Sequence, residues 1–475
     1  MSATPIILLP VEILVYIARE VRPQDLKNFV LTCRVVYSAS EDALKEYRGL
    51  RKQYRHVGNF IREQRSSACH YLAELLHRML ESPKVASHVE HFSYREDKRD
   101  EYRAADYKQS FQDSLENLQL NNSERETWWS DTSQNRYKPR ANQLMLGLLL
   151  HNLPNLEAFE WHSVENALDL ASLLQPTQLH QAGLRPPLLP FLKKVWLSAG
   201  RFGAYVGDIP LKQVLPFLAL PMIEYLDIQR FKCLDPPDDL DIAAVPPRSS
   251  SLRELVLSMS CLGKNLDHLL QLPRSLTKLN FVCPASDDES REVFPLGPAK
   301  QYHLERLKIR MVFWTHHIDR NALPLHTELQ YLETSCFLID DATLTPASDI
   351  KHYFPPSVRH IVFADSDLET QKDYFRYFQQ ILELRRAKIL PHLKRLTLRS
   401  EAIRITRFNR KVKATRKAGK ALGIEFDVDV DWPRYTIGLH PRDRRPVSWW
   451  RRSHDGYSSA DTDPVGCREP ISEDV

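Results

Sequence analysis

The chain has 475 residues, of which 43% are hydrophobic and 27% charged, and this is the composition of a folded globular protein. Its formal net charge at pH 7 is only +4, which is too balanced for nucleic acid or an anionic membrane to be the expected partner. With only 14 glycines, a glycine-rich phosphate-binding loop is not expected.

The cysteines and the lengths of the apolar runs indicate in which cellular compartment the protein is expected. The seven cysteines never stand in C-x-x-C spacing, so we expect reduced thiols rather than a disulfide framework or a zinc site. No run of 18 apolar residues is present, so a membrane span is not expected. The segment PIILLP near the start is too short for the core of a signal peptide, and no basic residue precedes it. We therefore expect a protein of the cytoplasm, the nucleus or both.

Residues 1–48 have the pattern of a small three-helix module. Ile13 and Ile17 stand four residues apart, which places them on one apolar face of a first helix. Pro23 is expected to end that helix, because the residue before a proline avoids the helical region. Asp25 is expected to cap a second helix, and a third follows. So few residues bury little surface, so the module is expected to pack on something else.

This segment resembles the F-box. The F-box motif begins Leu-Pro-x-Glu-Ile, as the chain does from Leu9, then places Asp-Leu at the second helix and ends on Cys-Arg. The resemblance implies binding to a Skp-type adaptor within a cullin–RING ubiquitin ligase. The adaptor-binding residues that it implies are Leu9, Pro10, Glu12, Ile13, Ile17, Asp25, Leu26, Val30 and Cys33. The alternative is a generic helical cap on a larger fold.

A repeat follows a helical linker at residues 49–84. Between residues 85 and 433 an apolar pattern L-x-x-L-x-L recurs ten times, and from Leu156 onward its first positions are 24 to 36 residues apart. Each copy predicts a short strand whose alternate residues enter a shared core, and helical stretches separate the copies. Units of this kind stack on one another because one alone cannot close a core. The fold class we predict is therefore α/β, with the three-helix F-box followed by a curved leucine-rich-repeat-like solenoid.

Three segments interrupt or end the repeats. Residues 94–140 are highly polar, with both charge signs, and read as a surface insertion. A helix and then a strand are expected between Leu398 and residue 433, closing the array. Residues 434–475 lose the periodicity and are expected to form a mostly disordered tail. The F-box followed by these degenerate repeats is similar to fungal F-box proteins with leucine-rich repeats.

No pattern of catalytic residues stands out. The chain has no G-x-S-x-G, P-loop or H-E-x-x-H motif. Cys69 and His70, with His77, His88 and His91 further along, lack the spacing of a four-ligand zinc site. We therefore expect a non-enzymatic chain with no cofactor and no bound metal.

The variable positions of the repeat strands are the expected substrate-binding surface, because they face away from the core. Aromatic and arginine side chains dominate interface energetics, and the basic ones would favour an acidic or phosphorylated segment. The residues selected are Trp196, Tyr225, Asp227, Arg306, Lys308, Arg310, Tyr331, His360, Arg395 and Arg399. The function that we expect is recruitment of a protein substrate to the ligase. The alternatives are a repeat scaffold without a ligase role, and strand positions that are merely solvated.

Overall fold

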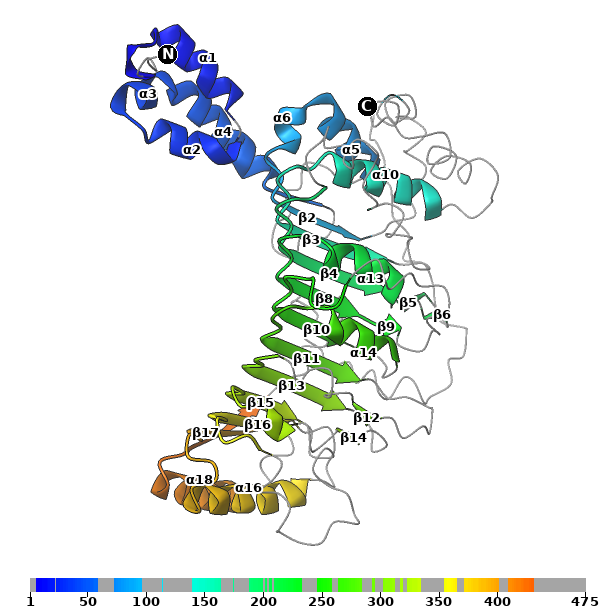
Figure 1. Ribbon diagram of the computed structural model, residues 1–475, viewed down its shortest axis with the longest axis vertical. Coiled ribbons are helices and arrows are strands. Elements are labelled where there is room, and N and C mark those ends of the chain that lie inside the picture. Colours follow the sequence, from blue (N-terminus) through cyan, green and yellow to red (C-terminus); the bar gives the residue numbers. More distant parts are fainter. Residues whose placement is uncertain are drawn as a thin grey trace, which may run out of the picture. The chain divides into compact units, whose positions relative to one another are not determined.

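Figure 1 shows the computed structural model of the chain. The structure describes residues 6–21, 23–58, 72–95, 113, 139–163, 174, 188–199, 201–202, 205–206, 209–232, 246–258, 264–283, 293–294, 302–311, 317–318, 323–334, 354–364, 371–400 and 409–430. The expected tail at residues 434–475 lies outside the described residues, as does most of the expected insertion at residues 94–140.

A parallel sheet of twelve strands dominates the fold, in the order β1-β2-β3-β4-β8-β10-β11-β13-β15-β16-β17-β18. The strands are β1 (His56–Val57), β2 (His91–Arg95), β3 (Ala158–Ser163), β4 (Lys194–Ala199), β8 (Tyr225–Gln229), β10 (Glu254–Ser258), β11 (Lys278–Cys283), β13 (Arg306–Met311), β15 (Tyr331–Thr334), β16 (His360–Ala364), β17 (Arg395–Ser400) and β18 (Glu425–Val430). Three short pairs lie outside it: β5 (Arg201–Phe202) with β6 (Tyr205–Val206), β7 (Ile209–Pro210) with β9 (Phe231–Lys232), and β12 (Val293–Phe294) with β14 (His317–Ile318). The α/β class is confirmed.

All ten predicted repeat strands are present and pair in register. The second apolar position of every repeat meets its counterpart in the next strand, along the row Phe92, Phe159, Val195, Leu226, Leu255, Leu279, Leu307, Leu332, Ile361 and Leu396, and Phe426 of β18 continues this row. Every member of this row is buried. Because side chains alternate along a strand, this register puts the whole buried row on one face, which we call the apolar face. The opposite side is the polar face.

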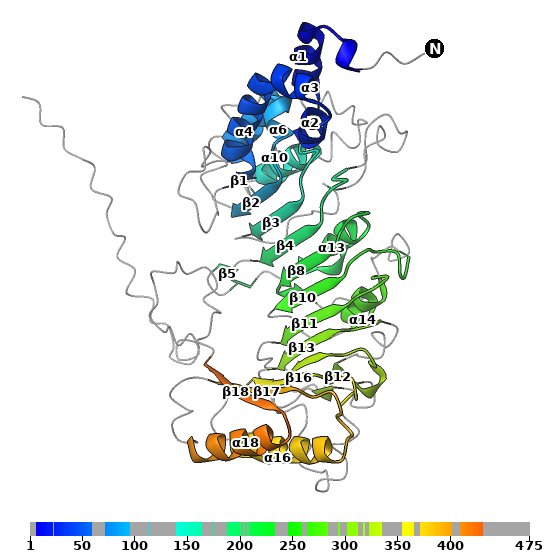
Figure 2. The same ribbon diagram turned by 90° about the vertical axis from the view of Figure 1, so that its left-hand side faces the viewer.

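Helices cover the apolar face. They are α5 (Leu72–Glu81), α6 (Pro83–Ala86), α10 (Pro139–His151), α13 (Leu211–Leu218), α14 (Lys264–Gln271), α16 (Gln371–Arg386) and α18 (Asn409–Ala421), with a 3-10 turn at Leu323–Leu325. The ring of Phe217 in α13 lies 5.7 Å from that of Phe159, centroid to centroid. Phe378 in α16 contacts both Phe363 and Phe426 edge to face, with centroid distances of 5.3 and 4.9 Å. Figure 2 shows α16 and α18 side by side, and the helix and strand expected to close the array are α18 and β18.

The sheet begins earlier than the sequence predicts. β1 lies inside residues 49–84, which were expected to form a helical linker, and it pairs with β2. It is only two residues long and lacks the repeat pattern. Gly58 follows it with a φ of +143°, where a Cβ would lie 1.6 Å from the Ser93 carbonyl oxygen. Only glycine fits this close approach.

The N-terminal module has four helices rather than three. They are α1 (Val11–Glu20), α2 (Pro23–Val30), α3 (Arg34–Ala39) and α4 (Glu41–Tyr54), after a 3-10 turn at Ile6–Leu8. Pro23 begins α2, since proline suits a first helical position, and Asp25 therefore lies in the first turn instead of capping it. Helix α4 runs past the expected module boundary at residue 48 and ends at Tyr54.

Ion pairs join α4 to the start of the sheet. Arg51 and Arg55 both pair with Glu90, which directly precedes β2, at 2.8 and 2.6 Å. Lys84 in α6 pairs with Glu46 in α4 at 2.8 Å. Tyr54 at the end of α4 belongs to the large core of the sheet. The last turn of α4 is therefore held by the sheet rather than by the other N-terminal helices.

Candidate functional site

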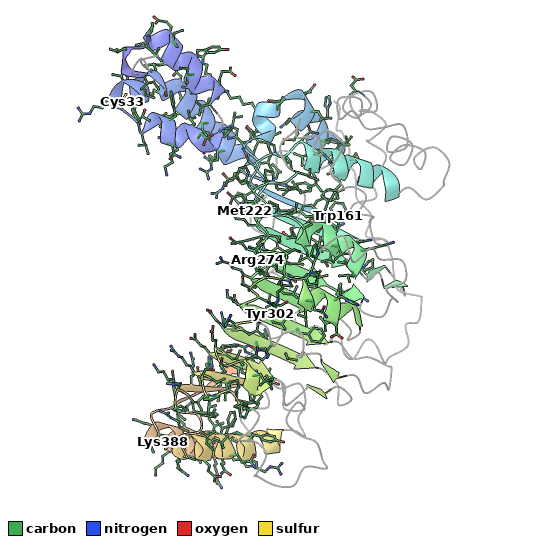
Figure 3. The ribbon with its side chains drawn as sticks, viewed as in Figure 1. Cys33, Trp161, Met222, Arg274, Tyr302 and Lys388 are labelled. Carbon is green, nitrogen blue, oxygen red and sulfur yellow. The ribbon has the colours of Figure 1, made fainter. Side chains whose placement is uncertain are left out.

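The nine residues implied by the F-box resemblance divide into core and surface. Leu26 and Val30 are each 4% exposed and lie in a small cluster with Ala18, Ala43 and Leu44. They cannot line a contact surface as expected, because they hold the helices together. Exposed side chains belong to Pro10, Glu12, Ile13 and Asp25, and half-buried ones to Leu9, Ile17 and Cys33. Cys33, which Figure 3 labels on the N-terminal helices, is a free thiol.

Helix α1 is apolar on two sides. Leu14 and Ala18 turn into the module and are buried, whereas Ile13 and Tyr16 are 45% and 65% exposed. At 100° per residue these two pairs lie on different sides of the helix. Sequence periodicity assigns a helix a single apolar face, so Tyr16 was not selected. The other exposed apolar residues of the module that the sequence prediction missed are Leu8, Val11, Leu31, Val35 and Tyr37.

The ten predicted substrate-binding residues do share the polar face. They occupy alternate positions of β4, β8, β13, β15, β16 and β17, opposite the buried row. Each described side chain among them is exposed or half-buried. Arg310 lies in β13, and the structure describes only its backbone. The repeat pattern therefore predicted which side of the sheet these residues occupy.

Carboxylates of nearby strands neutralise part of the basic cluster. Arg399 donates to Glu333 at 2.9 Å and to Asp429 at 3.0 Å. Arg395 donates to Asp427 at 2.7 Å, and this hydrogen bond lowers the pKa of the Asp427 carboxyl. We expected these cations to be available to a phosphorylated ligand. At β17 both arginines are instead paired with carboxylates of the chain itself. Nothing in a single strand's pattern shows that β18, with acids at alternate positions, lies beside it.

Glu333 is the centre of this network. Its side chain is 1% exposed and receives the Tyr331 hydroxyl at 2.7 Å, with the Lys308 ammonium at 3.6 Å. Burial, and then the Glu333 charge, raise the pKa of Tyr331. The Arg306 guanidinium lies 4.7 Å from the centre of the Tyr331 ring. The Glu333 carboxylate thus fixes the Tyr331 ring, Lys308 and Arg399 on the polar face.

A smaller group of the same kind lies on β4 and β8. The Tyr225 hydroxyl donates to Asp227 at 3.2 Å, and the Trp196 ring lies 5.2 Å from the Tyr225 ring between centroids. Burial and the Asp227 charge raise the pKa of Tyr225. Both tyrosines therefore stay protonated and hold fixed orientations.

Two histidines on the polar face make stability depend on pH. Burial, followed by the charges of Arg395 and Arg399, lowers the pKa of His360 to about 4. Burial and the neighbouring His56 lower the pKa of His91 to about 4 as well. Both imidazoles are therefore neutral in the folded chain at pH 5, where an unfolded histidine, with a pKa of 6.5, is protonated.

We expect stability to fall as the pH falls from 6.5 towards 4, because in that window the unfolded chain binds protons that the folded chain excludes. Allowing for solvent screening of these half-exposed rings, the loss is about 1 kcal/mol for each histidine. Urea unfolding at pH 7 and pH 5 measures it. His360→Gln should remove its share of the pH dependence; an unchanged difference between the two pH values would contradict the assignment.

The described residues offer no metal site or membrane span. No three His, Cys, Asp or Glu side chains among them converge as metal ligands would. Cys69 and His70 lie outside the described residues, and His77 pairs with Glu81 at 3.2 Å. No helix in the described part is both long and apolar enough to cross a bilayer.

Comparison with known proteins adds no family. No protein-family model matches the chain, and no curated protein matches it significantly. What the site can do therefore rests on its geometry. The geometry provides an apolar surface on the N-terminal helices and a polar sheet face rich in aromatic and charged side chains. Both are suited to binding proteins.

Proposed function

We propose that the chain is a substrate-recruiting adaptor and not itself an enzyme. In this proposal α1 to α4 are an F-box that binds a Skp-type adaptor of a cullin–RING ubiquitin ligase. The repeats form a leucine-rich-repeat-like solenoid whose polar face holds a target protein. Ubiquitin transfer then benefits from proximity, because the bound target has a high effective concentration at the ligase.

One observation carries the proposal: exposed apolar side chains gather on the N-terminal helices. Ten large apolar side chains are exposed among the described residues, and seven of them lie between Leu8 and Tyr37. Clustered exposed apolar groups of this kind mark a protein-binding surface. The Leu-Pro-x-Glu-Ile motif at Leu9 lies within the same segment, and it is this coincidence that favours a Skp-type adaptor as the occupant.

The second support is that α1 has one apolar side inside the module and another exposed to solvent. Leu14 and Ala18 already stabilise the module from its inner side. Ile13 and Tyr16 therefore expose apolar area to water, and this area does not contribute to the packing of the module. Burying both side chains against a partner would remove that cost.

Capture of a purified Skp-type adaptor by the full-length chain tests the proposal. Ile13→Asp should weaken capture by about tenfold or more, because it places a charge in the centre of an apolar contact. Circular dichroism of the variant should match wild type, since Ile13 faces outward. The matched control is Met222→Asp, which charges an exposed apolar position on the turn before β8 (Figure 3) and should leave capture unchanged.

Two outcomes would count against the proposal. Equal capture by wild type and Ile13→Asp would exclude the α1 surface as the docking site. Capture of the adaptor without ubiquitin transfer to any bound target would favour the alternative, a repeat scaffold without a ligase role.

A further inference from the structure

The polar face carries the same arrangement twice. Tyr225-Leu226-Asp227 in β8 and Tyr331-Leu332-Glu333 in β15 are matching tripeptides. In each, the tyrosine hydroxyl donates to the acid two residues later, at 3.2 and 2.7 Å. Residues two apart on a strand share a face, so the acid fixes the ring next to it.

The preceding strand adds a cation at the same register in both places. Lys194 pairs in register with Tyr225, and Arg306 with Tyr331. Both cations are exposed, and neither makes an ion pair with a carboxylate among the residues that the structure describes. We call Lys194, Trp196, Tyr225 and Asp227 the β8 unit. The β15 unit is Arg306, Lys308, Tyr331 and Glu333.

Each unit fits the same kind of ligand group. Each half-buried tyrosine ring already packs beside one neighbour, the Trp196 ring at 5.2 Å for Tyr225 and the Arg306 guanidinium at 4.7 Å for Tyr331. Ring and neighbour together form a patch on which an aromatic side chain can pack. The exposed cation beside it can pair with a carboxylate next to that side chain. An aromatic residue adjacent to an acidic one is therefore the complementary pair.

The two units lie on one line across the strands. Tyr225, Glu254, Lys278, Arg306 and Tyr331 are successive register partners. Four strand spacings separate the tyrosines, or about 19 Å. An extended chain covers this distance in about six residues. Between the units, Lys278 pairs with Glu254 at 2.9 Å, so the intervening surface is internally neutralised.

We propose that the β8 and β15 units are a two-point docking site for an extended segment of a partner protein with two aromatic–acidic pairs about six residues apart. The segment crosses the strands rather than extending the sheet. This inference rests on the proposed function, in which the polar face receives a protein. Glu254 and Glu333 neutralise Lys278 and Lys308, so among the described side chains each unit keeps one exposed cation, Lys194 or Arg306. Two separate positive charges suit a peptide with two acidic residues, whereas a nucleic-acid backbone needs a continuous basic groove.

Fluorescence anisotropy with the full-length chain tests the site. The probe is a fluorescein-labelled peptide, WESGSSWE, and the matched probe, WEWESGSS, has the same composition with the tryptophans two residues apart. We expect the first to bind about tenfold more tightly, because only it reaches both units. Tyr225→Ala and Tyr331→Ala should each reduce its affinity to that of the short-spaced probe. Lys413→Ala, at an exposed position of α18 outside both units and outside the N-terminal helices, is the control and should leave it unchanged.

The inference fails if the two probes bind equally, if neither binds, or if both tyrosine variants keep wild-type affinity. Tighter binding of a labelled single-stranded RNA at the same two tyrosines would also overturn it. Adaptor capture is measured on the same preparations. Normal capture with failed peptide binding removes only this inference, whereas failed capture by wild type removes the proposed function.

Discussion

Glu333→Ala should lower the free energy of unfolding by about 3 kcal/mol. The substitution removes a carboxylate that is 1% exposed and that neutralises Lys308 and Arg399. Breaking a buried charge pair from one side is costly because the remaining charges lose their partner. The Tyr331 hydroxyl also loses its acceptor inside the sheet. Urea denaturation followed by circular dichroism measures the change.

Asp429→Asn is the matched control, because it removes another partner of the same arginine. Asp429 is 48% exposed, so its pair with Arg399 contributes at most about 1 kcal/mol. Glu333→Gln should fall between the two, since an amide oxygen still accepts from Tyr331 but carries no charge. If Glu333→Ala were no more destabilising than Asp429→Asn, the network would contribute little to stability.

The sheet was predictable because its signal is local and repeated. Each L-x-x-L-x-L copy specifies a strand and the side that faces the core, and register then aligns the copies. Even Thr334, which breaks the apolar rule, is buried at its expected position. Strand β1 was not predicted, because two residues are too few to show a periodic pattern. Its position depends on Gly58 and on pairing with β2.

The details of both surfaces were less predictable, for two physical reasons. Neutralisation on the polar face depends on which strands are neighbours: Arg399 meets Asp429 only through the pairing of β17 with β18. On the N-terminal helices, the distinction between core and surface depends on how the helices pack. Leu26 and Ile13 are both apolar residues of the same motif, yet one is buried and the other exposed. Residue type alone does not separate them.

Leu26→Ala should unfold the N-terminal helices while the sheet remains folded. Truncating a buried leucine costs about 2–5 kcal/mol. The cluster around Leu26 holds only five buried residues, so this loss is comparable to all the stability that so small a core can supply. Hydrogen exchange measured by mass spectrometry should show rapid exchange in α1 and α2. The end of α4 should stay protected, because Tyr54 packs in the core of the sheet and Arg51 pairs with Glu90.

Leu279→Ala makes the same truncation in the large core of the sheet and should leave exchange in α1 and α2 unchanged. Wild-type protection of α1 in Leu26→Ala would show that the helices do not depend on their own cluster. The comparison with Ile13→Asp then separates the two ways of losing adaptor binding. Leu26→Ala should lose binding because the module unfolds, and exchange will report it. Ile13→Asp should lose binding with exchange unchanged, as expected if Ile13 contacts the adaptor directly.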